Sequence, residues 1–547
     1  MRTLRGATLS LLVVFWFGQS GRANELPARP PYLTIFLIDG LSQAVFASEL
    51  LAGRLPNIQQ MIDAGCYVKN GVTPFPSMTG YGFYAYLTGI DAAKSGVLGL
   101  RWLDRKSTPV ELKNYVGATN VQMNRDLVVP AKTLFEQFPD HYTSSFNSYL
   151  NRGVSRSFKS GWAFTAAKYR NVWAPIRFFS SVPYLGKWVF PDWERAEEQL
   201  IRHAVFDLLR RPKIQWITLA SPDGYHHIYG GDRGYVRLIQ NIDYLIGFYR
   251  RESSRLGLEV DRSYAVVSDH GMVDVDKNID LAEPLDRIGI HAGRGPATLF
   301  SDRKGLLSEQ LKQLDAVIAI NGNTLNYLYF CNRNVTSERS WRTRVSWNAL
   351  KKYPISGRTQ DVLATLTGTP GVELVMARDD RNRVHIESAA GEGVIEKQGD
   401  RYRYATRGRD PLGYEVGERF FVKAQLEGLT AREWLNETVD SLFPFAVVRA
   451  YELLHQAGCG DLVVTASPGY DFGKDFELLA GNYRGGHGGI RRDQSLVPFI
   501  LAGRGVQSSV RVKAALAEDL GATLLPLLGL KPAATVDGET IPGALSR

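Results

Sequence analysis

The chain of 547 residues is poor in cysteine and has no long apolar run, and both shortages restrict what it can be. Cys66, Cys331 and Cys459 are too few for a disulfide framework, and the sequence leaves open whether any two of them pair. No stretch reaches the roughly 18 consecutive apolar residues that suggest a membrane-spanning helix. With 44% hydrophobic residues, however, the chain can bury a large core.

Internal repeats, low-complexity tracts and any recognisable nucleic-acid-binding module are also missing. The formal net charge is +9, and removing Arg2, Arg5 and Arg22 with an N-terminal leader leaves 62 basic and 56 acidic residues, or +6. This diffuse excess favours anionic ligands without indicating nucleic acid. A denser basic run, from Cys331 to Arg358, is either a solvated face or a surface for phosphate-rich or lipid headgroup ligands.

The first 23 residues have the pattern of a secretory signal peptide. A basic start and a short apolar run precede small residues near Ala23, and the run is too short to cross a bilayer. We therefore expect a mature protein that begins close to Asn24, has no transmembrane segment, and is periplasmic or secreted. The oligomeric state is left open.

Three strand-like apolar runs each lead to an aspartate. YLTIFLI leads to Asp39, IQWITLA to Asp223 and YAVVS to Asp269. One aspartate after a strand is usually a turn residue or a helix cap. Because the carboxyl ends of the strands in an open α/β sheet form the ligand crevice, however, the three carboxylates are expected to meet at one edge.

Histidines accompany these carboxylates. His227 follows Asp223 by four positions, His270 follows Asp269 directly, and a glycine-rich G-G-H-G segment carries His487. Imidazole nitrogen and carboxylate oxygen are the ligands that zinc and similar divalent ions take, and a catalytic site keeps one position open for substrate. The combination predicts two metal sites.

A threonine supplies the second half of the predicted chemistry. Thr79 stands where an extended F-P-S segment meets a predicted helix. One interpretation is that Thr79 only caps this helix. The other is that Thr79 is a nucleophile activated by a metal, with the helix N-terminus offering N–H groups to a bound phosphate.

The order Asp, F-P-S-x-T, D-x-x-x-H, S-D-H-G and G-G-H-G resembles the alkaline phosphatase superfamily, and most closely its type I phosphodiesterase/nucleotide pyrophosphatase branch. The resemblance covers residues 31–285 and 440–545. It implies two zinc ions, or another divalent metal. One ion would be held by Asp39, Thr79, Asp269 and His270, with Thr79 also the nucleophile, and the other by Asp223, His227 and His487.

Residues around Thr79 and further along are candidates for substrate contacts. Gly80 adjoins the nucleophile, and Tyr81 and Phe83 either line the leaving-group pocket or pack in the core. Arg101, in G-L-R-W-L-D-R, is either a phosphate ligand or a surface arginine, because guanidinium binds phosphate oxygens in pairs. Thr79 cannot become the formylglycine that sulfatases need, so phosphoryl transfer is favoured.

The fold class is predicted as α/β, with a mainly parallel central sheet flanked by helices and an inserted α+β cap that contains a β-meander. We expect a signal peptide over residues 1–23, the first part of the catalytic core over 31–285, the cap over 286–430 and the second part of the core over 440–547. The apolar segment at residues 460–466 is expected to be a core strand.

The predicted function is an exported two-metal phosphoesterase that hydrolyses phosphodiesters through a covalent threonyl phosphate. Three alternatives stay open. A phosphomonoesterase would need extra cationic groups, for which Arg101, Arg105 and Arg152 are candidates. A phosphotransferase would pass the phosphoryl group to an alcohol. An exported metal-binding protein without turnover would have a decayed site in which some of the metal ligands are missing, and none of the expected ligands is missing from this sequence.

Overall fold

The computed structural model describes residues 31–108, 110–116, 120, 122–128, 132–158, 193–294, 311–335, 340–416, 418–473 and 483–546. The predicted signal peptide lies outside these residues. No helix within these ranges combines the length and apolar character that crossing a membrane requires. The three cysteines are buried as free thiols.

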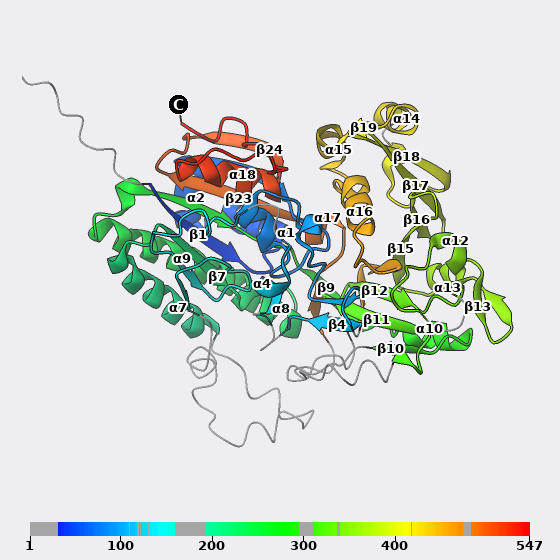
Figure 1. Ribbon diagram of the computed structural model, residues 1–547. Helices are drawn as coiled ribbons and strands as arrows, with labels where there is room; N and C mark the ends of the chain where they lie inside the picture. Colours follow the sequence, from blue (N-terminus) through cyan, green and yellow to red (C-terminus); the bar gives the residue numbers. More distant parts are fainter. Residues whose placement is uncertain are drawn as a thin grey trace, which may run out of the picture. The chain divides into compact units, whose positions relative to one another are not determined.

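An eight-stranded sheet forms the first layer of the fold (Figure 1), with the order β24-β2-β23-β8-β1-β7-β5-β6. Only β23 runs antiparallel to its neighbours, so the predicted mainly parallel sheet is confirmed. The strands are β1 (Tyr32–Ile38), β2 (Cys66–Val72), β5 (Ser144–Phe146), β6 (Arg156–Phe158), β7 (Ile214–Leu219), β8 (Arg262–Val267), β23 (Leu496–Gly503) and β24 (Val510–Leu516).

Helices cover both faces of this sheet. Alternate side chains of β1 enter different cores, as expected for a strand buried on both sides: Ile35 packs in one cluster and Phe36 in the other. The cluster of Phe36 includes side chains of α1 (Gln43–Leu51), α2 (Pro56–Asp63), α7 (Trp193–Asp207) and α9 (Arg233–Arg255). The cluster of Ile35 includes those of α3 (Phe83–Thr88) and α18 (Ala517–Leu527).

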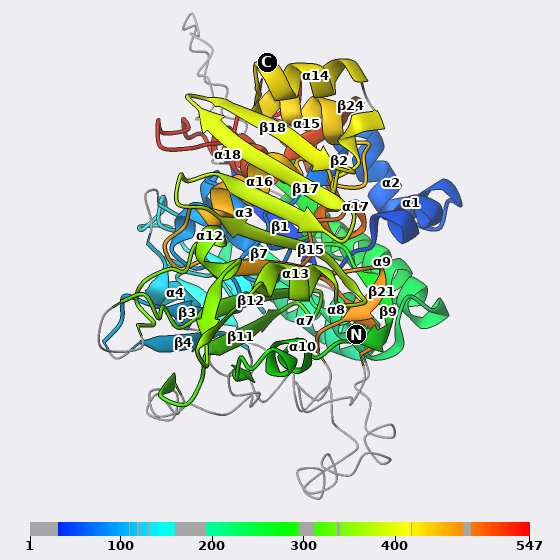
Figure 2. The ribbon, with the colours of Figure 1, turned by 90° about the vertical axis from the view of Figure 1, so that its right-hand side faces the viewer.

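A second sheet has nine strands in the order β10-β11-β12-β20-β15-β16-β17-β18-β19, and Figure 2 shows its broad face. The strands are β10 (Ala292–Arg294), β11 (Ala316–Asn321), β12 (Leu325–Phe330), β15 (Val372–Arg378), β16 (Val384–Ser388), β17 (Gly391–Gln398), β18 (Arg401–Gly408), β19 (Leu429–Thr430) and β20 (Leu462–Ala466). The antiparallel run from β15 to β18 is the predicted meander, which is confirmed.

Strand β20 does not lie in the sheet in which it was expected. Residues 460–466 were expected to form a core strand, but β20 lies in the second sheet, antiparallel to both β12 and β15. A short apolar strand buried on both faces has the same pattern in either sheet, so the sequence could not distinguish them. The second sheet therefore draws on the chain well beyond residue 440, where the core was expected to resume.

Smaller elements connect and flank the two sheets. The strands are β3 (Arg101–Asp104), β4 (Glu111–Asn114), β9 (Val273–Asn278), β13 (Tyr353–Ile355), β14 (Arg358–Gln360), β21 (Gly469–Asp471) and β22 (Gly485–Gly486). The helices are α4 (Met123–Asp126), α8 (Ser221–Tyr229), α10 (Ala282–Arg287), α12 (Trp347–Leu350), α13 (Val362–Thr367), α14 (Glu418–Leu426), α15 (Ala431–Thr438), α16 (Ala446–Leu454) and α17 (Arg492–Ser495). The single-turn helices are η1 (Ala92–Ser95), η4 (Leu208–Arg210), η5 (Glu259–Asp261) and η6 (Tyr414–Val416).

The basic run after Cys331 contributes several of its cations to contacts within the protein. Arg333 pairs with Asp315, Arg344 donates to the Leu454 carbonyl, and Lys351 lies over the ring of Trp347. These contacts do not support the alternative of a continuous headgroup-binding surface.

Candidate metal centre

The three aspartates meet because β1 lies between two parallel partners. Ile38 of β1 is in register with Leu219 of β7, and Leu37 is in register with Val267 of β8. Asp39 directly follows β1, Asp269 comes two positions after the end of β8, and Asp223 lies in the first turn of α8, which follows β7. The strand-end argument from the sequence thus places the carboxylates correctly.

The first group of side chains surrounds Thr79. Its Oγ1 lies 3.2 Å from Asp39 Oδ1 and 3.1 Å from His270 Nε2. The same Nε2 lies 3.4 Å from Asp39 Oδ1 and 3.5 Å from Asp269 Oδ2. All four residues are buried. These are the residues predicted to hold the first metal.

The second group converges on one oxygen of Asp223. His227 Nε2 lies 3.3 Å from Asp223 Oδ1, and His487 Nε2 lies 3.6 Å from it. The His487 ring also stacks on the His270 ring, with centroids 3.7 Å apart. The atoms of Asp223, His270 and His487 that could bind a metal lie within 4.8 Å of one another, and so do those of Asp39, Asp269 and His270, so the two groups adjoin and share His270.

All three histidines have the same orientation. Nδ1 lies 2.9 Å from the Ser77 carbonyl in His487, 2.8 Å from the Gly485 carbonyl in His227, and 3.1 Å from the Gly271 carbonyl in His270. A carbonyl can only accept, so each Nδ1 carries the proton and each Nε2 is left as a bare lone pair facing carboxylates. Histidines that bind metals are typically fixed in this way.

Several carboxylate oxygens of the site have neither a hydrogen-bond donor nor a positive charge beside them. Asp223 Oδ1 and both carboxylate oxygens of Asp269 are buried and accept no hydrogen bond. Buried acceptors without partners are costly, and three lone-pair nitrogens beside them add no positive charge. Oxygen and nitrogen donors of this kind fit one or two divalent cations, which would supply the missing charge.

The direction of the pKa shifts agrees with a shortage of positive charge. Burial, with added repulsion from Asp223, raises the pKa of Asp269 to about 8. Burial and the neighbouring carboxylates also raise the pKa of Asp39 well above its usual value. Burial lowers the pKa of His270 to about 4. Asp223 is the exception: burial acts to raise its pKa, but attraction to His227, His487 and His270 in their protonated forms outweighs burial and lowers it.

The structure does not place Thr79 as a helix cap. The N-cap position of α3 is Gly82, and no side chain bonds to the first turn. The N–H groups of residues 81–84 donate to carbonyls of the preceding turn. They are therefore not free to bind a phosphate, which differs from the prediction. The Thr79 side chain is therefore committed to the Asp39–His270 group alone.

The aromatic residues after Thr79 belong to the core, which corrects one of the two alternatives. Tyr81 is 1% exposed and donates its hydroxyl to the Phe75 carbonyl, while Phe83 is fully buried against Trp216. Burial of both side chains supports the core alternative. Gly80 adopts a left-handed backbone (φ +76°), and its predicted substrate contact stays a prediction.

The arginines considered for phosphate binding form contacts elsewhere. Arg101 is buried and donates to the Ile320 carbonyl of β11. Arg105 forms a paired hydrogen bond with Asp461, at 2.9 and 2.6 Å. Arg152 bonds to Glu136. Arg101 thus fixes β3 against the second sheet, and these contacts do not support its predicted role at the phosphate.

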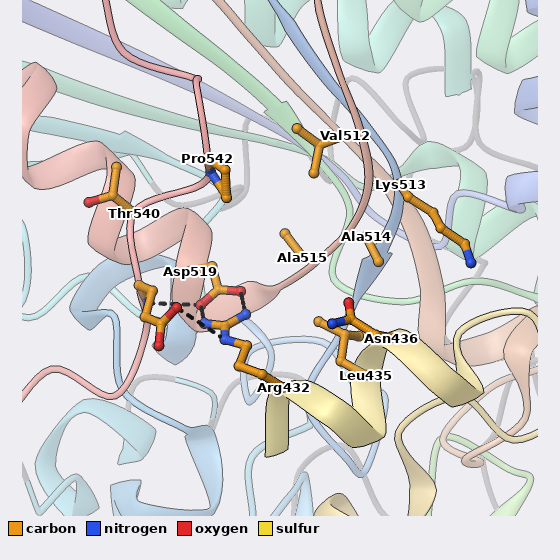
Figure 3. Close-up of a pocket in the computed structure, with 11 residues that line it drawn as sticks. Arg432, Leu435, Asn436, Val512, Lys513, Ala514, Ala515, Asp519, Thr540 and Pro542 are labelled. Atoms are coloured by element: carbon orange, nitrogen blue, oxygen red, sulfur yellow. Dashed lines mark hydrogen bonds and ion pairs between the residues drawn. The ribbon is translucent and has the colours of Figure 1, made fainter. Parts of the chain in front are cut away.

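Two cavities lie outside the Asp/His groups. One, of about 310 Å³, lies between α15 and β24 and is bordered by the Arg432–Asp519 ion pair (Figure 3). It contains none of the predicted site residues. The other, of about 230 Å³, is lined by Thr324 and Gln494, which bond to the loop that carries His487.

Sequence reasoning missed the groups that orient the histidines. The carbonyls of Ser77 and Gly485 lie inside the F-P-S and G-G-H-G motifs, but a motif does not reveal a backbone role. Gly485 also has a steric role, because a Cβ there would lie 2.0 Å from His226 Nδ1. His226 itself is buried with Nε2 3.6 Å from Asp274, outside the metal-ligating groups.

The parallel sheet with aspartates at adjacent strand ends, three oriented histidines and a buried threonine defines an α/β protein of the alkaline phosphatase-like fold with a candidate metal centre. The family model for type I phosphodiesterase / nucleotide pyrophosphatase matches residues 33–340, more than half of the chain. The chain belongs to this family.

Individual relatives are distant. Human ectonucleotide pyrophosphatase/phosphodiesterase family member 1 is 24% identical over 259 residues, which are 44% of this chain and 24% of the human protein. Murine ectonucleotide pyrophosphatase/phosphodiesterase 5 has a similar fold, with a TM-score of 0.53 and 13% identity over 94% of this chain and all of the other. An inactive threonine-to-alanine variant of that murine protein in complex with AMP matches with a TM-score of 0.51, at 13% identity over 94% of this chain and 97% of the other.

Proposed function

We propose that this protein is an exported, metal-dependent phosphodiesterase in which Thr79 attacks phosphorus and forms a covalent threonyl phosphate. The observation that carries the proposal is the buried convergence of Thr79, three aspartates and three histidine Nε2 atoms at the ends of β1, β7 and β8. Family membership supports the reaction class, and the inactive threonine variant of a solved relative supports a threonine nucleophile.

The aspartates, histidines and Thr79 of the candidate metal centre would hold two zinc ions, or two ions of another divalent metal. Asp39, Asp269, His270 and Thr79 would bind one ion, and the Asp223 group with His227 and His487 the other. Bound divalent ions lower the pKa of a nucleophile and stabilise charge that develops on phosphate and leaving-group oxygens.

The protein's own groups position the attack. Thr79 Oγ1 is fixed by Asp39 and His270, and Asp39 Oδ1, 3.2 Å away, can accept the hydroxyl proton. The Oγ1–phosphorus bond forms as the bond to the leaving oxygen breaks, and this oxygen departs as the alcohol with a proton that balances the one accepted by Asp39. Water then displaces Thr79 from phosphorus, releasing the monoester and restoring the hydroxyl proton.

The arginine contacts favour a diester over a monoester. A monoester carries an additional negative charge that needs further cations. Arg101, Arg105 and Arg152, the candidates from the sequence, bond to a backbone carbonyl, Asp461 and Glu136 respectively. Comparing rates on p-nitrophenyl phosphate and bis-p-nitrophenyl phosphate tests this preference. A higher kcat/KM for the monoester would contradict it.

Metal content is the first expected result. Purified protein prepared without chelator should contain about two zinc ions per chain, and His487→Ala should contain about one, since His487 belongs to only one predicted group. Elemental analysis measures both. His203→Ala, which changes an exposed histidine on α7, is the matched control and should keep two ions. Equal metal content in His487→Ala and the control would exclude the assignment of His487.

The proposal that the protein is exported rests on the sequence of residues 1–23, which lie outside the described part of the chain. Cleavage near Ala23 should give an exported protein that begins close to Asn24. N-terminal sequencing of the exported protein measures this. Retention of Met1 would show that the leader is not removed.

A further inference from the structure

A tight turn of the second sheet contacts the backbone of the candidate metal ligand His487. The turn, residues 322–324, joins β11 to β12. His487 donates its N–H to the Gly322 carbonyl at 2.7 Å, and Thr324 donates its N–H to the His487 carbonyl at 3.1 Å. The two strands of this turn lie in the second sheet, whereas β1, β7 and β8 carry the aspartates in the first. The second sheet therefore holds the segment that carries His487, while the first sheet carries the aspartates.

Gly322 permits this close approach. Its backbone is left-handed (φ +58°), and a Cβ at this position would lie 2.6 Å from the His487 carbonyl oxygen and 2.8 Å from His487 Nδ1. A side chain would displace the imidazole or the turn. The turn is thus packed directly against the ring that faces Asp223.

The Thr324 hydroxyl adds a second connection. Its Oγ1 lies 2.6 Å from the His487 carbonyl oxygen and 2.7 Å from Gln494 Oε1, and the same Oε1 accepts the Gly489 N–H at 2.7 Å. One hydroxyl therefore lies between the His487 carbonyl and the side chain that holds Gly489. Thr324 has one hydroxyl proton and is buried, so whichever of the two oxygens accepts that proton, water does not readily replace the bond.

The opposite side of the loop is held by the segment that leads to Thr79. Ser77 accepts from His487 Nδ1 at 2.9 Å, and its hydroxyl donates to the Gly489 carbonyl at 2.7 Å. His487 is consequently fixed between Ser77, in the segment that leads to Thr79, and Thr324, in the turn of the second sheet. Loss of either contact leaves the glycine-rich loop free to shift the imidazole.

We propose that Thr324 is a positioning residue for metal binding by His487, so that the second sheet completes the metal centre without supplying a ligand. The inference rests on the proposed function, because it requires that His487 binds a metal. Groups that orient a metal ligand typically change metal affinity by about 10- to 100-fold when they are removed. Removing the Thr324 hydroxyl should weaken the affinity for one of the two ions by this factor and leave the affinity for the other unchanged.

The test compares three variants of the full chain. Thr324→Val removes the hydroxyl and keeps the branched shape, and Thr324→Ser restores a hydroxyl. Thr465→Val is the matched control, because Thr465 pairs with Leu325 on the neighbouring strand, is equally buried, and has a hydroxyl without a hydrogen-bond partner. Zinc affinity is measured for each protein by titration against a competing chelating dye, and melting temperature is measured on the same metal-free samples.

Thr324→Val should bind one zinc ion at least about 10-fold more weakly and the other unchanged, with Thr324→Ser close to wild type. Thr465→Val should match wild type. Melting temperatures of metal-free Thr324→Val and Thr465→Val should be similar, which separates positioning from general destabilisation. Wild-type affinity for both ions in Thr324→Val, or an equal loss in Thr465→Val, would overturn the inference. A wild-type protein that binds no zinc would overturn the proposed function first.

Discussion

Thr79→Ala should lose at least about 10³-fold in kcat/KM on phosphodiesters, because no other hydroxyl is placed between Asp39 and His270. The variant should still fold. Thr79 does not cap α3, so the change removes only the hydroxyl's local hydrogen bonds, at a cost of about 1 kcal/mol.

Thr79→Ser distinguishes loss of the nucleophile from a local disturbance. It keeps a hydroxyl for ionisation and should retain part of the activity. Kinetics and melting temperature are to be measured on the same preparations. If Thr79→Ala turned over substrate at a rate near wild type, Thr79 would not be the nucleophile, however the metals were bound.

Arg449→Met should destabilise the protein by about 3–5 kcal/mol, the cost of leaving buried carboxylates without their partner. Arg449 is 3% exposed and bonds to Asp91 at 2.7 Å and to Glu518 at 2.9 and 3.1 Å. These residues come from α16, the segment after α3 and the start of α18. The ion pairs therefore connect three parts of the chain that are far apart in sequence.

The stability of Arg449→Met should change with pH in a defined direction. Burial raises the pKa of Glu518 to about 7 even with Arg449 present, and removing the guanidinium should raise it further. A carboxyl with a raised folded-state pKa binds protons more readily than in the unfolded chain, so stability falls as pH rises. The loss in Arg449→Met should thus be smaller at about pH 5 than at about pH 8.

Urea denaturation of wild type and variant at both pH values measures this effect. Arg202→Met is the matched control, because Arg202 forms an ion pair with Glu198 at 2.6 Å on an exposed helix surface. Exposed pairs of this kind contribute about 0–1 kcal/mol. Equal stability of Arg449→Met and Arg202→Met would contradict the structural role given to the buried group.

The sequence predicted the centre well where its geometry follows from the sheet. Asp39 and Asp269 come within two residues of the ends of parallel strands, so their convergence is a consequence of strand direction and register. His227 and Asp223 are close because both lie on α8, one helical turn apart. The order of the motifs then sufficed to connect these residues to His487, although 217 positions separate His270 from His487.

Other features depend on tertiary contacts that a single sequence does not contain. The segment that became β20 has the same apolar pattern in either sheet. Tyr81 and Phe83 adjoin Thr79 in sequence, but α3 turns them into the core. Arg101 carries no sign of its partner, the Ile320 carbonyl, because that partner is backbone. The same reason hides Thr324, whose contact with His487 is made to a carbonyl oxygen.

The stereochemical course at phosphorus tests the central claim most directly. A phosphorothioate diester of known configuration is hydrolysed in heavy-oxygen water, and the configuration of the product is determined. Attack by Thr79 followed by displacement by water inverts phosphorus twice, so the account predicts net retention. Net inversion would show a single displacement by water and would contradict a covalent intermediate on Thr79.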